Sequence, residues 1–267
     1  MESLPLAASY PDSPIARLFE REGIVFDDPD KQLWVMDQVA LDTPKTGLPQ
    51  LQYGTRGYCE VTKRVFNKID DFDYPDKIMH TVPRFAAMYY QAYQSHLQGR
   101  REEISGPWRT AFYNRHVARS HAAAGMMRFW GVHIGYDLGI VLDQTDTKQE
   151  HKNDYRQVVN TILSETAGEI WPQYLKVPNA IGKLGVKLAL QEIFGARDEA
   201  WIAYEMLTDH RGDELARQQI LQEMGGRVTR RLLLVHTAAD YMLRAFTAVP
   251  EGIWSKSHDE DRSAEFD

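Results

Sequence analysis

The chain has 267 residues and is 43% hydrophobic and 26% charged, which suits one large globular domain or two small ones. Its net charge of −7 excludes a non-specific nucleic-acid binder and a protein held on an anionic membrane surface. The single cysteine, Cys59, excludes an intrachain disulfide and a cysteine-based metal centre. No stretch reaches the roughly 20 apolar residues that a membrane span needs, and the N-terminus shows no signal-peptide pattern. We therefore expect a cytoplasmic protein with no nucleic-acid partner and no membrane insertion.

Residues 1–55 are predicted to be an N-terminal extension with short helices. Ser13 and Pro14 indicate a helix start, because serine caps the first turn and proline suits the first helical position. A second short helix is expected at residues 30–42, followed by a loop. The extension carries enough apolar side chains to dock on another surface. We expect it to cover the mouth of a cavity or to form a homodimer contact.

Residues 56–250 are predicted to be the main domain, because apolar residues recur there with helical spacing and do not alternate with period two over a useful length. The fold class is all-α, a single-domain bundle of roughly nine to eleven helices. The longest central helix is expected from about residue 119 to residue 142. The many aromatic residues are compatible with an internal cavity for a largely apolar ligand. Residues 251–267 are highly charged and are predicted to be a mobile tail.

The central helix carries three regularly spaced glycines. Gly131, Gly135 and Gly139 recur at i, i+4 and i+8, so on a helix they form one stripe. Each of them costs roughly 1 kcal/mol against alanine in a helix interior. This pattern indicates a neighbouring helix whose backbone approaches closely.

The same helix carries the candidate catalytic residues. His133 and Asp137 are i, i+4 partners within hydrogen-bond reach, in a stretch too apolar for a solvated face. We expect the carboxylate to raise the pKa of His133, provided that desolvation does not outweigh it. His133 is then the candidate general acid/base, and Asp137 orients it. The alternative is a structural pair that only satisfies a buried imidazole.

The sequence around this pair resembles a known family. His133-Ile-Gly-Tyr-Asp-Leu138 is similar to the H-I-N-x-D-L signature of a bacterial-type domain-of-unknown-function family, number 5995. The resemblance covers roughly residues 58 to 236, and Gly135 stands where the family has asparagine. It implies an all-helical single domain and brings no established activity with it. Three further elements are similar to the family's: Trp108-Arg-Thr-Ala-Phe112, the segment Asp154 to Leu163, and Arg197-Asp-Glu-Ala-Trp201.

Two polar residues of these further elements, Asn160 and Arg197, are predicted to polarise a substrate oxygen. Neither suits an apolar interior without partners. Arg197 near Asp137 would hold that carboxylate in its ionised form. Three aromatic residues are predicted to contact the substrate: Trp130, Trp108 and Tyr89.

We expect an acid/base enzyme that needs no cofactor and acts on a small, largely apolar organic molecule. A cyclase, isomerase or lyase of specialised metabolism fits, because the sequence has no nucleotide-binding motif. One alternative is a metal-dependent hydrolase or oxygenase, whose divalent metal would bind His133 and Asp137 together with His236 and Asp240, which repeat the i, i+4 spacing. The other alternative is a protein that binds a small ligand without catalysis.

Overall fold

The computed structural model describes residues 9–113, 122–175 and 179–236. Within these ranges the chain is helical and has no β-strand, which confirms the predicted all-α fold. Three π-helical segments, His133–Asp137, Val158–Leu163 and Leu232–His236, continue neighbouring α-helices. The α-helices are α1 (Pro14–Glu22), α2 (Pro29–Asp42), α3 (Leu51–Asn67), α4 (Pro75–Leu97), α5 (Gly106–Tyr113), α6 (Ala122–Val132), α7 (Leu138–Gln144), α8 (Lys152–Gln157), α9 (Ser164–Leu175), α10 (Asn179–Asp209) and α11 (Glu214–Arg231).

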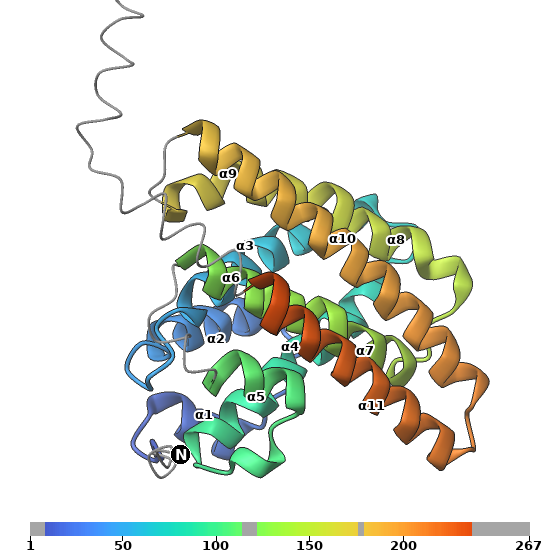
Figure 1. The fold of residues 1–267 in the computed structure, drawn as a ribbon, viewed down its shortest axis with the longest axis horizontal. Coiled ribbons are helices and arrows are strands. Elements are labelled where there is room, and N and C mark those ends of the chain that lie inside the picture. The colour runs from blue at the N-terminus through green and yellow to red at the C-terminus, as the bar shows by residue number, and fades with distance from the viewer. Residues whose placement is uncertain (1–8, 114–121, 176–178, 237–267) are drawn as a thin grey trace, which may run out of the picture.

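Helices α6 and α7 lie in the middle of the bundle (Figure 1). Helices α3 and α4 pack against them on one side, and α10 and α11 pack against them on another. Helix α2 packs along α3 and buries Val35, Met36 and Val39 completely. These residues of the predicted extension are therefore part of the hydrophobic core.

Side-chain caps determine where several helices begin. The hydroxyl of Ser13 accepts backbone N–H groups of the first turn of α1, and Pro14 takes the first helical position, as predicted. The start of α4 is capped from another helix, because the buried carboxylate of Asp154 in α8 accepts the N–H groups of Asp73 and Tyr74, at 3.0 and 2.8 Å. This bond between distant segments positions α4, which contributes to the site.

The central helix differs from the prediction of one uninterrupted α-helix. Its first predicted residues, up to 121, lie outside the described part of the chain. From Ala122 onwards it runs as α6, then as the π-helical segment His133–Asp137, then as α7. A π-helical turn holds more residues than an α-helical turn, and such turns are frequent at functional sites. Here the segment begins and ends at the two candidate catalytic residues.

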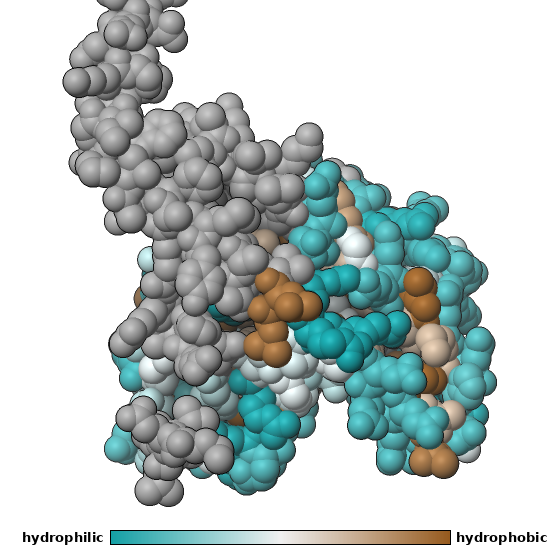
Figure 2. All heavy atoms as spheres, viewed as in Figure 1, coloured by the Kyte–Doolittle hydropathy of each residue, from teal (hydrophilic) through white to brown (hydrophobic). Residues whose placement is uncertain are grey.

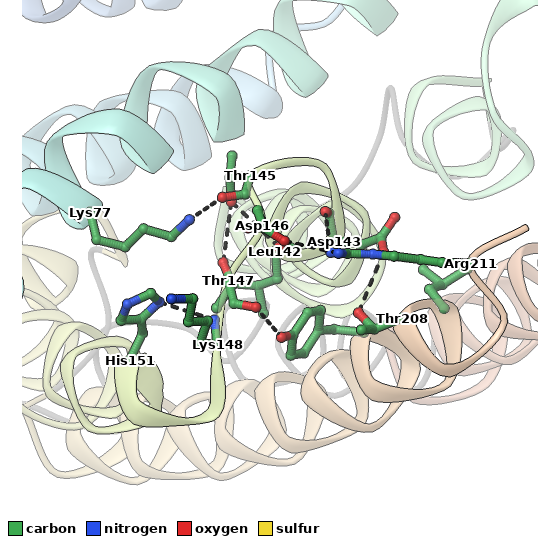
Figure 3. Close-up of polar contacts among 12 residues, drawn as sticks. Lys77, Leu142, Asp143, Thr145, Asp146, Thr147, Lys148, His151, Thr208 and Arg211 are labelled. Atoms are coloured by element: carbon green, nitrogen blue, oxygen red, sulfur yellow. Dashed lines mark hydrogen bonds and ion pairs between the residues drawn. The ribbon is translucent and has the colours of Figure 1, made fainter.

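The C-terminal end of α7 is held by polar contacts from other helices (Figure 3). Lys77 of α4 donates a hydrogen bond to the carbonyl of Thr145. The hydroxyl of Tyr204 in α10 donates to the carbonyl of Thr147. Arg217 of α11 pairs with Asp143 at 2.7 Å. Because α4, α10 and α11 all contact the residues from Asp143 to Thr147, the end of the helix that carries the candidate site is fixed in place.

The surface shown in Figure 2 is mostly hydrophilic, with small apolar patches between polar residues. Exposed large apolar side chains on the described surface include Ile202, Leu215 and Leu234. Single exposed apolar residues such as Ile202 and Leu215 are common on globular proteins, whereas Leu234 lies next to a second exposed residue, Leu233. Among the described helices, none combines the length and apolar character needed to cross a membrane.

Candidate functional site

His133 and Asp137 form the predicted pair in the centre of the protein. Both residues are completely buried, with 0% of their surface exposed. The Nδ1 atom of His133 lies 2.9 Å from Oδ2 of Asp137. The indole Nε1–H of Trp108, in α5, donates to the same oxygen at 2.9 Å. Asp137 therefore joins the imidazole to a second helix of the bundle.

Aromatic rings enclose the imidazole of His133. The ring of Phe85, in α4, stacks on it with a centroid distance of 3.8 Å and an interplanar angle of 6°. The ring of Tyr58, in α3, meets it edge-on at 4.6 Å, and Phe129 lies at 5.4 Å. Phe85 is only partly buried, whereas Tyr58 is buried. Of these three rings, only that of Phe85 reaches the edge of the core.

Two polar atoms of the pair lack hydrogen-bond partners. They are Nε2 of His133 and Oδ1 of Asp137, for which the described residues provide no donor or acceptor. Buried side-chain polar atoms in proteins nearly always have a partner. Since Oδ2 already accepts the Trp108 N–H, neutral His133 donates to that oxygen through Nδ1, which leaves a lone pair on Nε2. The pair can therefore accept a proton from, or hydrogen-bond, a molecule that reaches it.

Burial has the largest influence on the pKa values of both residues of the pair. Desolvation lowers the pKa of His133 below its usual value, and the opposing hydrogen bond and charge of Asp137 are weaker. Desolvation likewise raises the pKa of Asp137, against the effects of His133 and Trp108. A raised pKa of His133 is expected only if desolvation does not outweigh the carboxylate; here desolvation outweighs it, and the pKa is lowered. A neutral imidazole is the form that acts as a base.

The close approach of a neighbouring helix that the glycine stripe predicts is seen at Gly139, against α10. A Cβ atom on Gly139 would lie 2.8 Å from the carbonyl oxygen of Ala200, too close for any real side chain. A Cβ atom on Gly135 would lie 3.5 Å from Cβ of Ala196, an ordinary contact. Gly131 is only partly buried. The close approach therefore depends on Gly139.

An internal cavity of about 60 Å³ lies beside the pair, in agreement with the predicted cavity. Trp130, one of the three aromatic residues predicted to contact the substrate, lines it. His133 does not line it, because Phe85 and Tyr58 lie between the imidazole and the cavity. Four helical regions supply the wall: Tyr58, Val61, Thr62 and Val65 of α3; Ile78, Thr81, Val82 and Phe85 of α4; Trp130, Ile134 and Leu138 of the central helix; and Tyr155, Val158, Val159 and Leu163.

The structure places the other predicted binding residues away from the cavity wall. Arg197 donates a hydrogen bond to Asn160 and pairs with Asp198 at 2.7 Å. Asn160 is exposed, and neither residue is a partner of Asp137. The prediction that Arg197 holds the Asp137 carboxylate ionised is therefore wrong. It failed because α10 brings the buried Arg197 against the exposed Asn160 rather than against the pair.

The two remaining aromatic residues also have roles that differ from the prediction. Trp108 does not line the cavity, and its indole N–H binds Asp137 instead. Tyr89 is completely buried, and its hydroxyl lies 3.1 Å from that of Thr55. Both residues support the core around His133 rather than the cavity. Of the described residues, none before Tyr58 lines the cavity, so the N-terminal extension does not cover it there.

The predicted metal site cannot be assembled from the described residues. His133 and Asp137 are together, but the side chain of His236 and all of Asp240 lie outside the described part of the structure. Within that part, no group of three or more histidine, cysteine, aspartate or glutamate residues is placed to hold a metal ion.

A second buried histidine was not singled out from the sequence. Both ring nitrogens of His96 are bonded, Nδ1 to the hydroxyl of Tyr113 and Nε2 to the carbonyl of Thr46, each at 2.8 Å. The Tyr93 hydroxyl lies 2.8 Å from that of Thr46 and donates to Asp42 at 3.0 Å. The Ser13 hydroxyl also donates to Asp42, at 2.6 Å. We call this set the His96 network: Ser13, Asp42, Thr46, Tyr93, His96 and Tyr113.

The chain belongs to the family of unknown function DUF5995, which matches residues 33–237. This agrees with the resemblance seen in the sequence around His133. The match begins at residue 33 rather than near residue 58, so most of α2 lies within the family region. No curated protein and no solved structure matches the chain.

Proposed function

We propose that this protein is an acid/base enzyme that binds a small, largely apolar molecule in the cavity and transfers a proton through Nε2 of His133. One observation carries the proposal: a fully buried, neutral imidazole, oriented by Asp137, lies behind the Phe85 and Tyr58 rings of an apolar cavity, and no described residue is a partner of its Nε2. An imidazole that served only as packing would be expected to have both nitrogens bonded, as His96 does.

The reaction class follows from the groups that are present. A neutral histidine removes a proton, and the resulting cation is stabilised by the Asp137 carboxylate beside it. The same group can return the proton at another position, so isomerisation or elimination needs no other group. The apolar wall keeps water out and strengthens these charge interactions.

Access to His133 requires Phe85 to move. The cavity of about 60 Å³ admits only a molecule of a few heavy atoms, and Phe85 separates it from the imidazole. Phe85 lies two residues after Pro83, which is inside α4 and removes one backbone hydrogen bond from that helix. Rotation of this partly exposed ring would join the cavity to Nε2 and enlarge it.

A small carbon acid tests the proposal without knowledge of the natural substrate. We expect the protein to catalyse exchange of the C1 protons of 1-nitropropane for deuterium in D2O, followed by NMR. Phe85→Ala should increase the rate because it exposes Nε2. His133→Gln should lower the catalysed rate by about a hundredfold, the usual contribution of a general base. His96→Gln, a change at a buried histidine outside the pair, is the matched control and should keep the rate.

Equal exchange by wild-type and His133→Gln protein would refute the role of His133. Binding of 1-nitropropane, measured by its line broadening, separates catalysis from affinity. If the wild-type protein binds the probe and catalyses no exchange, it is a ligand-binding protein without catalysis. One observation favours this second candidate: His133 does not line the cavity while Phe85 covers it.

A further inference from the structure

The wall of the cavity exposes almost no polar surface. Its lining residues are aliphatic or aromatic apart from two threonines, and none carries a formal charge at neutral pH. The hydroxyl of one of these threonines, Thr81, lies 2.9 Å from that of Tyr155 and is already engaged. An ion in this cavity would lose its hydration without gaining a counter-charge, and a polar group would find few partners. The part of a ligand that fills the cavity is therefore an uncharged hydrocarbon group.

The cavity is lined over two turns of α3 and over two turns of α4. In α3 the lining residues extend from Tyr58 to Val65, and in α4 they extend from Ile78 to Phe85. Each set recurs at i, i+3, i+4 and i+7, which is one face of a helix and about 10 Å from end to end. A cavity of about 60 Å³ that touches both helices over this length is narrow. We call it the apolar channel.

One end of the apolar channel adjoins His133, because the rings of Tyr58 and Phe85 line the channel and also contact the imidazole. The other lining residues of these two helices lie further from the pair. The last of them in α3 is Val65, two turns after Tyr58, and the first in α4 is Ile78, two turns before Phe85.

Val65 and Ile78 lie towards the same end because α3 and α4 run in opposite directions along the central helix. In α3, Gly54 lies against Phe129, one turn before the tyrosine that contacts the imidazole. In α4, Lys77 binds the carbonyl of Thr145, two turns before the ring that stacks on the imidazole. The apolar channel therefore extends from His133 towards the C-terminal end of α7.

We propose that the substrate carries an unbranched hydrocarbon tail, which lies in the apolar channel and places an acidic C–H bond at the His133 end. This inference rests on the proposed function and specifies its substrate class. A cavity of about 60 Å³ has room for about four to six groups the size of a water molecule. Spread over two helical turns, these groups lie in single file, so a branched tail would have to push the packed walls apart.

A series of 1-nitroalkanes, from 1-nitropropane to 1-nitrooctane, tests the proposal in wild-type protein. Their dissociation constants are measured by ligand-observed NMR. Each added CH2 group should tighten binding about fourfold until the apolar channel is full, and further groups should add nothing. The branched isomer of 1-nitrohexane, 3,3-dimethyl-1-nitrobutane, should bind about tenfold more weakly than the straight chain. The two isomers have the same atoms, so general hydrophobicity does not separate them.

A variant at the far end of the apolar channel sharpens the test. Ile78→Phe should shorten the channel and weaken 1-nitrohexane about tenfold relative to 1-nitropropane. Ile202→Phe is the matched control, because it is the same substitution at a residue that is 53% exposed and does not line the cavity. It should change neither affinity. The wild-type series needs no variant, so the proposal stays testable if Ile78→Phe does not fold.

Proton exchange of the same compounds in D2O separates this inference from the proposed function. Affinity that is independent of chain length, or equal for the two isomers, would overturn the apolar channel, and catalysed exchange would then leave the proposed function standing. Binding that depends on chain length and branching as described, without exchange in wild-type or Phe85→Ala protein, would support the apolar channel and refute the enzyme.

Discussion

Two buried clusters, each with one histidine and one aspartate, lie in the same core. In the His96 network, both ring nitrogens of the histidine are bonded and Asp42 accepts two hydroxyl groups. In the other cluster, His133 and Asp137 bond to each other, and each has one atom for which the described residues provide no partner. The His96 network, whose histidine has both ring nitrogens bonded, is suited to holding helices together. The His133–Asp137 pair, whose hydrogen bonding is incomplete, is suited to reacting with a ligand.

This difference predicts different consequences for stability and for proton transfer. The His96 network joins α1, α2 and α4, so its loss should be seen mainly in folding. The His133 cluster lies on a π-helical segment beside the cavity, so its loss should be seen mainly in proton transfer. Four changes test this, in order of their expected effect on the free energy of unfolding.

Asp42→Ala should have the largest effect. It removes the acceptor of the Ser13 and Tyr93 hydroxyl groups in a buried site, which costs about 2–3 kcal/mol. Urea unfolding of wild-type and variant protein measures the loss. Exchange of 1-nitropropane should be unchanged in the protein that remains folded. A loss of exchange without a loss of stability would reverse the roles of the two clusters.

Gly139→Ala should destabilise the protein by about 2 kcal/mol, because the new methyl group would overlap the Ala200 carbonyl oxygen and force α10 away from the central helix. Gly135→Ala is the matched control: its methyl group would make only ordinary contacts, and alanine favours a helix. Both are measured by thermal and urea unfolding. Equal effects would show that α10 does not fix the position of the central helix.

His96→Gln should change how stability depends on pH. Burial lowers the pKa of His96, so the unfolded chain binds a proton below its value near 6.5 while the folded chain does not. The contribution of His96 to the free energy of unfolding is therefore largest above this pH and falls as the pH decreases towards the folded-state pKa. The fall is at most about 1.4 kcal/mol per pH unit for each such histidine. The variant should lose less stability than wild type between pH 7.5 and 5.5 in urea titrations.

Burial lowers the pKa of His133 as well, so His133 also makes the free energy of unfolding fall as the pH decreases. The raised pKa of Asp137 acts oppositely: its contribution is full below the unfolded value near 3.9 and is lost as the pH rises through the folded value. His96→Gln is therefore the cleaner variant for this measurement. If the free energy of unfolding falls equally in wild type and variant as the pH decreases, His96 has the same pKa in the folded and unfolded states.

Asp137→Asn should have the smallest effect on stability, below about 1 kcal/mol. Asparagine keeps an oxygen for the Trp108 N–H and removes a group whose charged form is disfavoured by burial. Proton exchange of 1-nitropropane should nevertheless fall at least tenfold, because the imidazolium loses its counter-charge. A loss of stability as large as that of Asp42→Ala, with exchange unchanged, would make the pair structural.

The sequence predicts those features of the molecule that depend on neighbours along the chain. Helical periodicity indicates the all-α fold, and the i, i+4 spacing of His133 and Asp137 indicates their hydrogen bond. The glycine spacing indicates the close contact with α10. Each of these follows from the geometry of a single helix, so no knowledge of the tertiary fold is needed.

Features that depend on distant segments could not be predicted in this way. Phe85, which covers His133, is one of many aromatic residues of α4, and only the packing of α4 on the central helix selects it. The contact between Asn160 and Arg197, away from the pair, also follows from packing, as does the balance between desolvation and Asp137 at His133. A single amino-acid sequence carries no direct signal for these.

The π-helical segment His133–Asp137 has a consequence for the engineering of this protein. Such a turn holds one residue more than the α-helical turn that it replaces. We expect deletion of Gly135 to restore an α-helix, shorten the spacing of the pair from four residues to three, and rotate α6 by about 100° relative to α7. Trp130 and the pair would then no longer face the same neighbours. Removal of one residue would thus replace the candidate site with an ordinary packed helix.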